Sequence, residues 1–401
     1  MTGPRFVHRN FAWLAPEHSD YEHSRVVVLP VPYDSTASGW VGSREGPAAI
    51  IDASGNLELY DIGIGCEPYL VGIHTLPEVA AHSGSPEAMA ERLEGIVGEL
   101  IDDGKFVVTL GGEHTVAVGA ARAYARRTSG LSVLAFDAHA DMRDEYLDSK
   151  YNHACTLRRI SEIAPIAQVG LRSAEREEHV YIREQGLRFY SPREFRAMGP
   201  EAVAEQLSES VYVTFDLDAF DSSVVSALGT PEPGGLHWDE VSDMMETVAR
   251  RRHIVGFDVT ELAPSLGPRA NAQLAAKLVY RLIGLAIRAP SKMPPRKRRQ
   301  ETSRSSASHE SVSKDSVLAA LRRFDREYPS SDSYDNWLNK GNYKYALRHS
   351  RKLYPPKLIL SWITGANRED FNGGPQTNSV FERLGFQVID KPPAKWADRR
   401  R

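Results

Sequence analysis

A pattern of metal ligands at the end of a predicted strand limits the folds open to this chain. The segment Asp137-Ala138-His139-Ala140-Asp141 follows directly on an apolar run, residues 131–136. In extended backbone, alternate residues project to the same side, so two carboxylates and an imidazole would converge on one point. Such ligands suit a divalent cation such as manganese, zinc or nickel. Taken alone, the segment is also compatible with a solvated acidic loop, although a metal site is favoured.

Two further apolar runs lead into residues of the same kind. Residues 211–213 precede Thr214-Phe215-Asp216-Leu217-Asp218, and residues 105–110 precede Gly111-Gly112-Glu113-His114. In open α/β sheets, functional groups collect at the carboxyl ends of the strands, so we expect the three strand ends to meet. The candidate metal ligands are then His114, Asp137, His139, Asp141, Asp216 and Asp218. Six ligands, four of them carboxylates that repel one another, predict two cations.

Strand-like and helix-like segments alternate through the first part of the chain. Strands are predicted at 25–31, 105–110, 131–136, 166–169, 211–215 and 253–259. Residues 86–103 have the apolar spacing of an amphipathic helix. This alternation predicts an α/β fold, a three-layer αβα architecture in which helices cover both faces of a mainly parallel sheet.

Charge divides the chain into two parts. Residues 289–401 carry 23 Lys and Arg against 12 Asp and Glu, a net charge of +11. The remaining 26 basic and 41 acidic residues give residues 1–288 a net charge of −15. We therefore predict a first domain at 1–288, a flexible basic linker at 289–313 and a small basic accessory domain at 314–401.

The segment 314–401 has the pattern of a small α+β domain. Val317, Leu318, Leu321 and Phe324 form one helical face. A small core is predicted from the aromatic residues Trp337, Tyr343, Tyr345, Trp362, Phe371, Phe381 and Phe386. From the residues alone, we expect a small domain for packing or oligomerisation.

Composition excludes several classes of protein. The chain has only Cys66 and Cys155, which makes a disulfide framework implausible and a reducing cytoplasm the expected compartment. Residues 1–16 lack the apolar core of a signal peptide. The most apolar stretch, 274–287, is interrupted by Lys277 and Arg281, so we expect no membrane span.

From about Val26 to Leu285 the sequence resembles the ureohydrolases, the family of arginase and agmatinase, and is most similar to agmatinases. The three metal-ligand motifs occur in the order found in that family. Further matching segments are Leu29-Pro30-Val31-Pro32-Tyr33-Asp34, Gly42-Ser43-Arg44-Glu45-Gly46-Pro47, Gly229-Thr230-Pro231-Glu232-Pro233-Gly234-Gly235-Leu236 and Asp258-Val259-Thr260-Glu261-Leu262-Ala263-Pro264.

The resemblance implies an arginase-like fold and a site for two Mn²⁺ ions. Asp137 and Asp216 would bridge the ions, His114 and Asp141 would complete the shell of one, and His139 and Asp218 that of the other. A water held between two cations becomes hydroxide near neutral pH and would attack the guanidinium carbon of the substrate, which releases urea. The resemblance implies that Glu261 binds the guanidinium group and that His153 carries the proton for the leaving amine. The predicted catalytic residues are thus His153, Asp141 and Glu261.

The chain departs from the arginases beside His153. Arginases carry an Asn two places before this His, where it reads the amino-acid end of arginine, and a Gly after it. Here these positions are Tyr151 and Ala154. We therefore expect a cationic guanidino compound without an α-carboxylate, with hydrolysis of agmatine to putrescine and urea as the leading hypothesis. The family resemblance also implies a homo-oligomer, a trimer or hexamer.

Two other functions stay open. The segment after the basic linker resembles the N-terminal head domain of some modification-dependent HNH restriction endonucleases. The chain could therefore bind nucleic acid or a protein partner through 289–401 and use the ureohydrolase fold as an oligomeric platform. A deacetylase-like enzyme with a single zinc ion would not need His114 or the pair Asp216 and Asp218, and metal stoichiometry separates it from the leading hypothesis.

Overall fold

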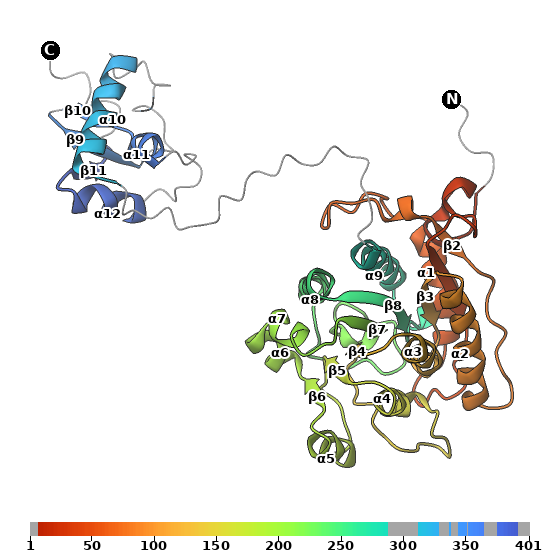
Figure 1. Cartoon of the computed structure of the whole chain (residues 1–401). Helices are drawn as coiled ribbons and strands as arrows, with labels where there is room; N and C mark the ends of the chain where they lie inside the picture. Colours follow the sequence, from red (N-terminus) through yellow and green to blue (C-terminus); the bar gives the residue numbers. More distant parts are fainter. Residues whose placement is uncertain are drawn as a thin grey trace. The chain divides into compact units, whose positions relative to one another are not determined.

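The computed structural model describes residues 7–287, 312–328, 337, 344–350, 352–364 and 375–391. The chain divides into two compact units, Met1–Pro294 and Pro295–Arg401, and each is considered by itself (Figure 1). The predicted linker, residues 289–313, lies outside the described residues except for its last two positions. Its flexibility and the predicted domain limits therefore remain predictions.

The first unit is built on one eight-stranded sheet, in which every neighbouring pair of strands is parallel. The strand order is β2-β1-β3-β8-β7-β4-β5-β6. The strands are β1 (Val26–Val31), β2 (Ile73–Thr75), β3 (Phe106–Gly111), β4 (Leu131–Phe136), β5 (Ile166–Val169), β6 (Arg188–Tyr190), β7 (Ser210–Asp216) and β8 (His253–Thr260).

All six predicted strands are present. The sequence did not predict β2 and β6, the two edge strands, which have three residues each. Strands of three residues whose side chains are mostly exposed or only partly buried have no apolar run to mark them.

Nine α-helices occur in the described part of the first unit. They are α1 (Gly46–Ser54), α2 (Pro86–Asp102), α3 (Val116–Arg127), α4 (Thr156–Ser161), α5 (Arg176–Glu184), α6 (Pro192–Met198), α7 (Pro200–Ala204), α8 (Trp238–Arg251) and α9 (Ala270–Ile287). The predicted helix at 86–103 is α2. The Ser85 hydroxyl caps it by accepting a hydrogen bond from the Ala88 N–H, and Pro86 occupies its first turn.

The helices cover both faces of the sheet (Figure 1). Side chains alternate along each strand, so Val26 and Val28 of β1 belong to the apolar cluster that includes α1, α8 and α9, whereas Val27 and Leu29 belong to the cluster that includes α2 and α3. Strands buried on both faces read as continuous apolar runs, which explains why the central strands were found in the sequence. The predicted three-layer α/β architecture is confirmed.

The second unit contains a separate three-stranded antiparallel sheet of order β10-β9-β11. Its elements are α10 (Lys314–Glu327), β9 (Tyr345–His349), β10 (Lys352–Tyr354), α11 (Pro356–Thr364), α12 (Pro375–Arg383) and β11 (Gln387–Asp390). Val317, Leu321 and Phe324 face its core as predicted, together with Trp337 and Phe381. Of the predicted aromatic core, Tyr343 and Phe371 lie outside the described residues. The predicted α+β class is confirmed.

Two expectations about the chain as a whole can be compared with the described residues. Cys66 and Cys155 are both free and buried. No helix in the described ranges is long and apolar enough to cross a membrane.

Candidate metal centre and cavity

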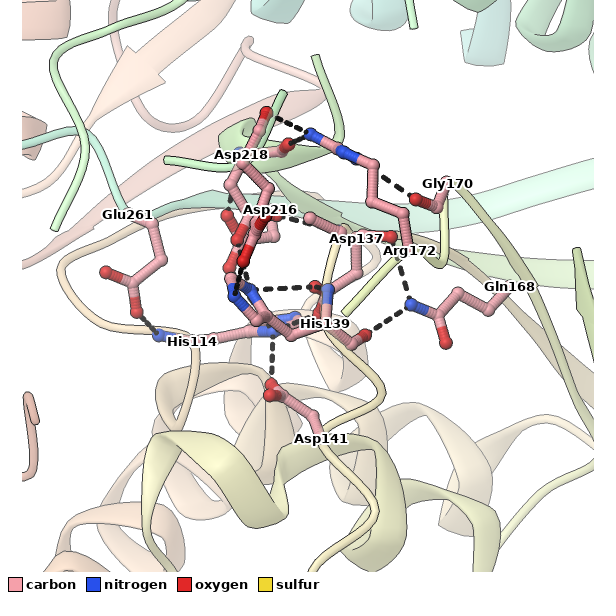
Figure 2. A network of polar contacts seen from close by, with 12 residues as sticks. His114, Asp137, His139, Asp141, Gln168, Gly170, Arg172, Asp216, Asp218 and Glu261 are labelled. Carbon is pink, nitrogen blue, oxygen red and sulfur yellow. Dashed lines mark hydrogen bonds and ion pairs between the residues drawn. The ribbon is translucent and has the colours of Figure 1, made fainter. Parts of the chain in front are cut away.

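Four neighbouring strands bring the candidate site together at their carboxyl ends. The central order β3-β8-β7-β4 places the segments that follow these strands side by side. His114 follows β3, Glu261 follows β8, Asp216 ends β7, and Asp137 follows β4. Figure 2 shows the six predicted metal ligands pointing toward one another, with Glu261 beside His114. The sequence alone predicted that the ends of β3, β4 and β7 would meet, whereas the family resemblance supplied Glu261.

His114 is the centre of one half of the cluster. Its Nδ1 lies 3.1 Å from Oδ2 of Asp137, 3.1 Å from Oδ2 of Asp141 and 3.6 Å from Oδ2 of Asp216. The His114, Asp137 and Asp216 side chains offer ligand atoms that all lie within 4.8 Å of one another. These side chains are at most 5% exposed, so water does not screen their charges.

His139 is the centre of the other half. Its Nδ1 lies 2.7 Å from Oδ2 of Asp218 and 4.0 Å from Oδ1 of Asp137. His139, Asp137 and Asp218 form a second group whose ligand atoms lie within 4.8 Å of one another. Asp137 belongs to both groups, because its Oδ2 faces His114 and its Oδ1 faces His139. Two overlapping groups that share one carboxylate have the arrangement needed for two adjacent cations.

The backbone that carries three of these ligands differs from the extended strand that the sequence predicted. Strand β4 ends at Phe136, and Asp141 adopts a left-handed conformation with φ of 48°. A non-glycine residue in this region is strained and persists only where its surroundings hold it. Here Gln168 of β5 holds the segment, since its Nε2 donates to the carbonyl oxygens of Asp137 and His139 at 3.0 and 2.5 Å. The three side chains therefore converge through a bent segment that leaves the strand direction.

Arg172 holds the backbone around Asp218 in place. Its guanidinium group donates to five backbone carbonyls, including those of Asp218 and Glu232 at 2.7 and 2.9 Å (Figure 2 shows it beside Asp218). A Cβ on Gly235, in the Gly-rich segment 229–235, would lie 2.5 Å from the backbone nitrogen of Asp221 and 2.7 Å from the Arg172 Nη2. This close approach requires glycine and gives the segment a backbone-shaping role.

Burial and mutual repulsion disturb the pKa values of the cluster. Burial raises the pKa of Asp137 to about 8, with further contributions from Asp141 and Asp218. Burial likewise raises the pKa of Asp216, and the charges of Asp218 and Asp137 raise it further. For His139, burial acts to lower the pKa, but the carboxylate of Asp218 outweighs burial and raises the pKa to about 10. The cluster therefore needs added positive charge to keep its carboxylates ionised at neutral pH.

The donor set fits a pair of divalent cations. Asp137 Oδ2 is buried and accepts no hydrogen bond of acceptable geometry from the described residues, although His114 Nδ1 lies close to it. A buried carboxylate oxygen is costly when it is left without a partner, and a cation would satisfy it. Two imidazoles and four carboxylates match the ligand preferences of manganese, zinc and related ions.

A cavity of about 290 Å³ opens above the ligands. Its lining includes Ser38, His139, Asp141, His153, Asp218 and Glu261. Glu175 and Glu178 contribute further carboxylates, against which Arg143 is the one arginine in the lining. A cavity with this excess of carboxylates suits a cationic ligand.

Glu261 links the cavity to the ligands. One oxygen, Oε1, accepts a hydrogen bond from the backbone N–H of His114 at 2.7 Å. Burial raises the pKa of Glu261 to about 8, and the nearby charge of Glu113 raises it further. Its φ of 68° is again left-handed, which marks a backbone position held under strain at the site.

His153 lies on another wall of the cavity, at the start of a short 3₁₀ helix, His153–Cys155. Burial lowers the pKa of its imidazole. The preceding Tyr151 does not line the cavity, and its hydroxyl accepts a hydrogen bond from Arg122 of α3 at 2.6 Å. The position that reads the amino-acid end of the substrate in arginases is thus occupied by a side chain that packs elsewhere.

Thr36 and Ser38 contact His153, and sequence reasoning missed both. They lie in the loop after β1, and Ser38 Oγ is 2.7 Å from Nε2 of His153. The His153 N–H donates to the Thr36 hydroxyl at 2.9 Å. Ser and Thr are common in loops of every kind, so the residue types did not mark these positions as functional. The only sequence signal was that the loop directly follows the first strand of the sheet.

Comparison with known families and proteins gives a consistent result. The sequence model of the Arginase family matches residues 24–284. An N(1)-aminopropylagmatine ureohydrolase of Synechocystis sp. is 37% identical over 277 residues, which cover 66% of this chain and 90% of the relative. An agmatinase of Pyrococcus horikoshii is 32% identical over 285 residues, which cover 71% of this chain and 99% of the relative.

Solved structures agree with these relatives. The structure of the agmatine ureohydrolase of Thermoplasma volcanium superimposes with a TM-score of 0.64 and 31% identity, over 71% of this chain and 96% of that one. The proclavaminate amidino hydrolase of Streptomyces clavuligerus gives a TM-score of 0.65 at 26% identity, over 71% of this chain and 98% of that one.

Proposed function

The chain belongs to the arginase family and is an amidinohydrolase, and we propose that it hydrolyses a cationic guanidino compound to urea and an amine with the help of two divalent cations. The observation that carries this proposal is the pair of ligand groups that share Asp137 at the floor of an acidic cavity.

Six side chains would hold the cations, which we take to be Mn²⁺. Asp137 and Asp216 would lie between the two ions, with His114 and Asp141 on one side and His139 and Asp218 on the other. The short contacts of His114 with Asp141 and of His139 with Asp218 support this division. When bound, the cations supply the positive charge that lowers the pKa of a water molecule and makes it a nucleophile near neutral pH.

Glu261 would bind the guanidinium group. Its Oε1 is fixed by the His114 N–H, and its Oε2 accepts no hydrogen bond from the described residues. A guanidinium group presents planar N–H donors that match a carboxylate, so Glu261 can orient the substrate carbon above the ligands. In this position the positive charge of the substrate guanidinium group also keeps Glu261 ionised, despite the raised pKa of that carboxyl.

His153 would carry the proton for the leaving amine. Its imidazole lines the cavity with Asp141 and Glu261, and burial keeps it neutral by lowering its pKa. A neutral imidazole can accept the proton that the attacking water loses and then donate it to the departing nitrogen. The carbon–nitrogen bond breaks as that nitrogen is protonated, which leaves urea and the free amine.

The substrate is proposed to be agmatine, or a longer guanidino amine of the same kind. Tyr151 does not line the cavity, which supports a substrate without the α-carboxylate of arginine. The exposed carboxylate of Glu175 lines the cavity 3.3 Å from the Arg143 guanidinium, and its other oxygen would accept from the ammonium group at the far end of agmatine. Because relatives at 37% identity are named N(1)-aminopropylagmatine ureohydrolases, this longer polyamine is the second candidate.

Urea release from a substrate panel tests the proposal. The full chain is loaded with Mn²⁺ and supplied with agmatine, N(1)-aminopropylagmatine, guanidinobutyrate, guanidinopropionate and arginine. We expect urea from agmatine or its aminopropyl derivative and little from arginine. Absence of urea from every compound, with two metal ions bound per chain, would overturn the proposal.

A second activity is proposed for residues 289–401. Their net charge of +11, against −15 for the rest of the chain, favours binding to nucleic acid. Binding of a DNA duplex that weakens steeply with salt is the expected result, and salt-independent absence of binding contradicts it. A trimeric or hexameric state and a cytoplasmic location remain predictions, which light scattering and cell fractionation would check.

A further inference from the structure

The loop that follows β1 is anchored to the interior through Glu113. The Glu113 carboxylate is fully buried and accepts two hydrogen bonds from Thr36, at 2.7 Å from its backbone N–H and at 2.9 Å from its hydroxyl. The Glu113 N–H donates in turn to the carbonyl oxygen of Tyr33 at 2.7 Å. Thr36 is therefore held on both its backbone and its side chain.

Thr36 in turn forms hydrogen bonds to the segment that carries His153. Its hydroxyl donates to Glu113 and accepts from the His153 backbone N–H at 2.9 Å. Its carbonyl oxygen accepts from Nδ2 of Asn152 at 3.3 Å. Because an N–H can only donate and a carboxylate accepts, the direction of the hydrogen bonds through the Thr36 hydroxyl is fixed.

Ser38, two residues further along the same loop, holds the imidazole itself. Its Oγ lies 2.7 Å from Nε2 of His153, and its backbone N–H donates to the same nitrogen at 3.3 Å. A backbone N–H has no acceptor role, so Nε2 is the acceptor and the proton of the neutral ring lies on Nδ1. Both Ser38 and His153 line the cavity.

We propose that Thr36 and Ser38 are positioning residues for His153, Thr36 by fixing its backbone and Ser38 by fixing the orientation and tautomer of its ring. This inference rests on the proposed function, in which His153 donates a proton to the leaving amine. Proton transfer requires the donor within about 2.6–3.2 Å of its partner. Loss of this placement by about 1 Å can cost about 100-fold in rate.

The kinetic test uses the full chain loaded with Mn²⁺, agmatine as substrate, and the variants Thr36→Val, Thr36→Ser and Ser38→Ala. Valine has the shape of threonine without the hydroxyl, whereas serine keeps the hydroxyl. We expect kcat to fall about 10- to 100-fold in Thr36→Val and Ser38→Ala, with a much smaller change in KM. Thr36→Ser should recover most of the loss.

A second substrate separates positioning from general damage. In the O-guanidino analogue of agmatine, the leaving group is a weakly basic alkoxyamine that departs with less help from an acid. The loss in kcat for Thr36→Val and Ser38→Ala should therefore shrink markedly with this analogue. An equal loss for both substrates, or no loss for either, would overturn the inference.

Histidine-selective NMR tests the same contacts without catalysis. The ¹³C and ¹⁵N shifts of His153, assigned by comparison with His153→Gln, should report the Nδ1–H tautomer in the parent protein and a mixture of tautomers in Ser38→Ala. Unchanged shifts contradict the inference. If the parent protein releases no urea from any guanidino compound, the proposed function fails, and these shifts still decide whether Ser38 holds the ring.

Discussion

At the residue scale, the orientation of His114 depends on a chain of hydrogen bonds that runs away from the cavity. His114 Nε2 lies 2.9 Å from the Thr214 hydroxyl, which donates to Oδ1 of Asp258 at 2.9 Å. Tyr212 donates to the other oxygen of Asp258 at 2.7 Å. With the Thr214 hydrogen committed to Asp258, its oxygen accepts from Nε2–H, so Nδ1 is the nitrogen that gives up its proton and binds a cation.

Replacement of Thr214 by valine should therefore weaken metal binding. We expect the affinity for Mn²⁺ to fall by about 10- to 100-fold, the usual cost of losing a partner of a metal-bound histidine. Isothermal titration calorimetry on the metal-free protein measures this loss. Thr214→Ser keeps the hydroxyl and is the matched control, and equal affinities of the valine and serine variants would contradict the role given to Thr214.

Glu261 supplies a prediction about substrate binding. In Glu261→Gln the amide oxygen can still accept from the His114 N–H, but the negative charge is lost. Removal of one charged partner from a buried pair costs about 2–5 kcal/mol, so kcat/KM for agmatine should fall about 30-fold or more. The bound metal content, measured by atomic emission, should remain at two ions per chain. A variant with unchanged kcat/KM would exclude Glu261 from guanidinium binding.

At the element scale, the turn after β3 passes so close to the loop after β1 that no side chain fits between them. A Cβ on Gly112 would lie 2.1 Å from the carbonyl oxygen of Tyr33. Gly112→Ala should therefore lower the free energy of unfolding by about 1–3 kcal/mol, the range found for overpacked positions. Chemical denaturation followed by circular dichroism measures the change.

Gly95, within α2, is the matched control for Gly112. A Cβ there would meet no atom within 4 Å, so Gly95→Ala should raise helix stability by up to about 1 kcal/mol. If both variants changed stability in the same direction, the close approach at Gly112 would not be the cause.

Metal binding at the four strand ends should also be coupled to the release of protons. In the metal-free protein the pKa of Asp137 is raised to about 8 and that of His139 to about 10, so both hold a proton at pH 7. A cation must displace these protons, and its apparent affinity should therefore rise as the pH rises from about 6 to 8. Calorimetry in two buffers of different ionisation enthalpy counts the protons released. A pH-independent affinity without proton release would contradict these pKa directions.

At the scale of the whole molecule, two units of opposite charge are joined in one chain. All the candidate ligands and the cavity residues belong to the acidic unit. Residues 1–288 alone should therefore release urea from agmatine with a kcat/KM within about threefold of the full chain, as expected for a domain with its own core. Salt-sensitive DNA binding should be lost in the same truncation. A truncated chain without activity, but with its metal ions bound, would assign the second unit a part in catalysis.

The sequence by itself predicted the three-layer fold, the central strands and the meeting of the six candidate ligands. It could do so because buried parallel strands read as apolar runs, and because the ligands directly follow those runs. It did not predict the short edge strands β2 and β6, and it wrongly described Asp141 as part of an extended segment.

Only the tertiary structure decided which residues support the site from elsewhere in the chain. Thr36 and Ser38 reach His153 across more than a hundred residues, and Asp258 reaches His114 through Thr214. Hydroxyl and carboxylate side chains of this kind carry no periodic signal, because their role depends on a partner that folding brings near. The types of metal ligand could thus be read from short segments of the sequence. The orientation of their side chains depends on long-range hydrogen bonds, which exist only in the folded chain.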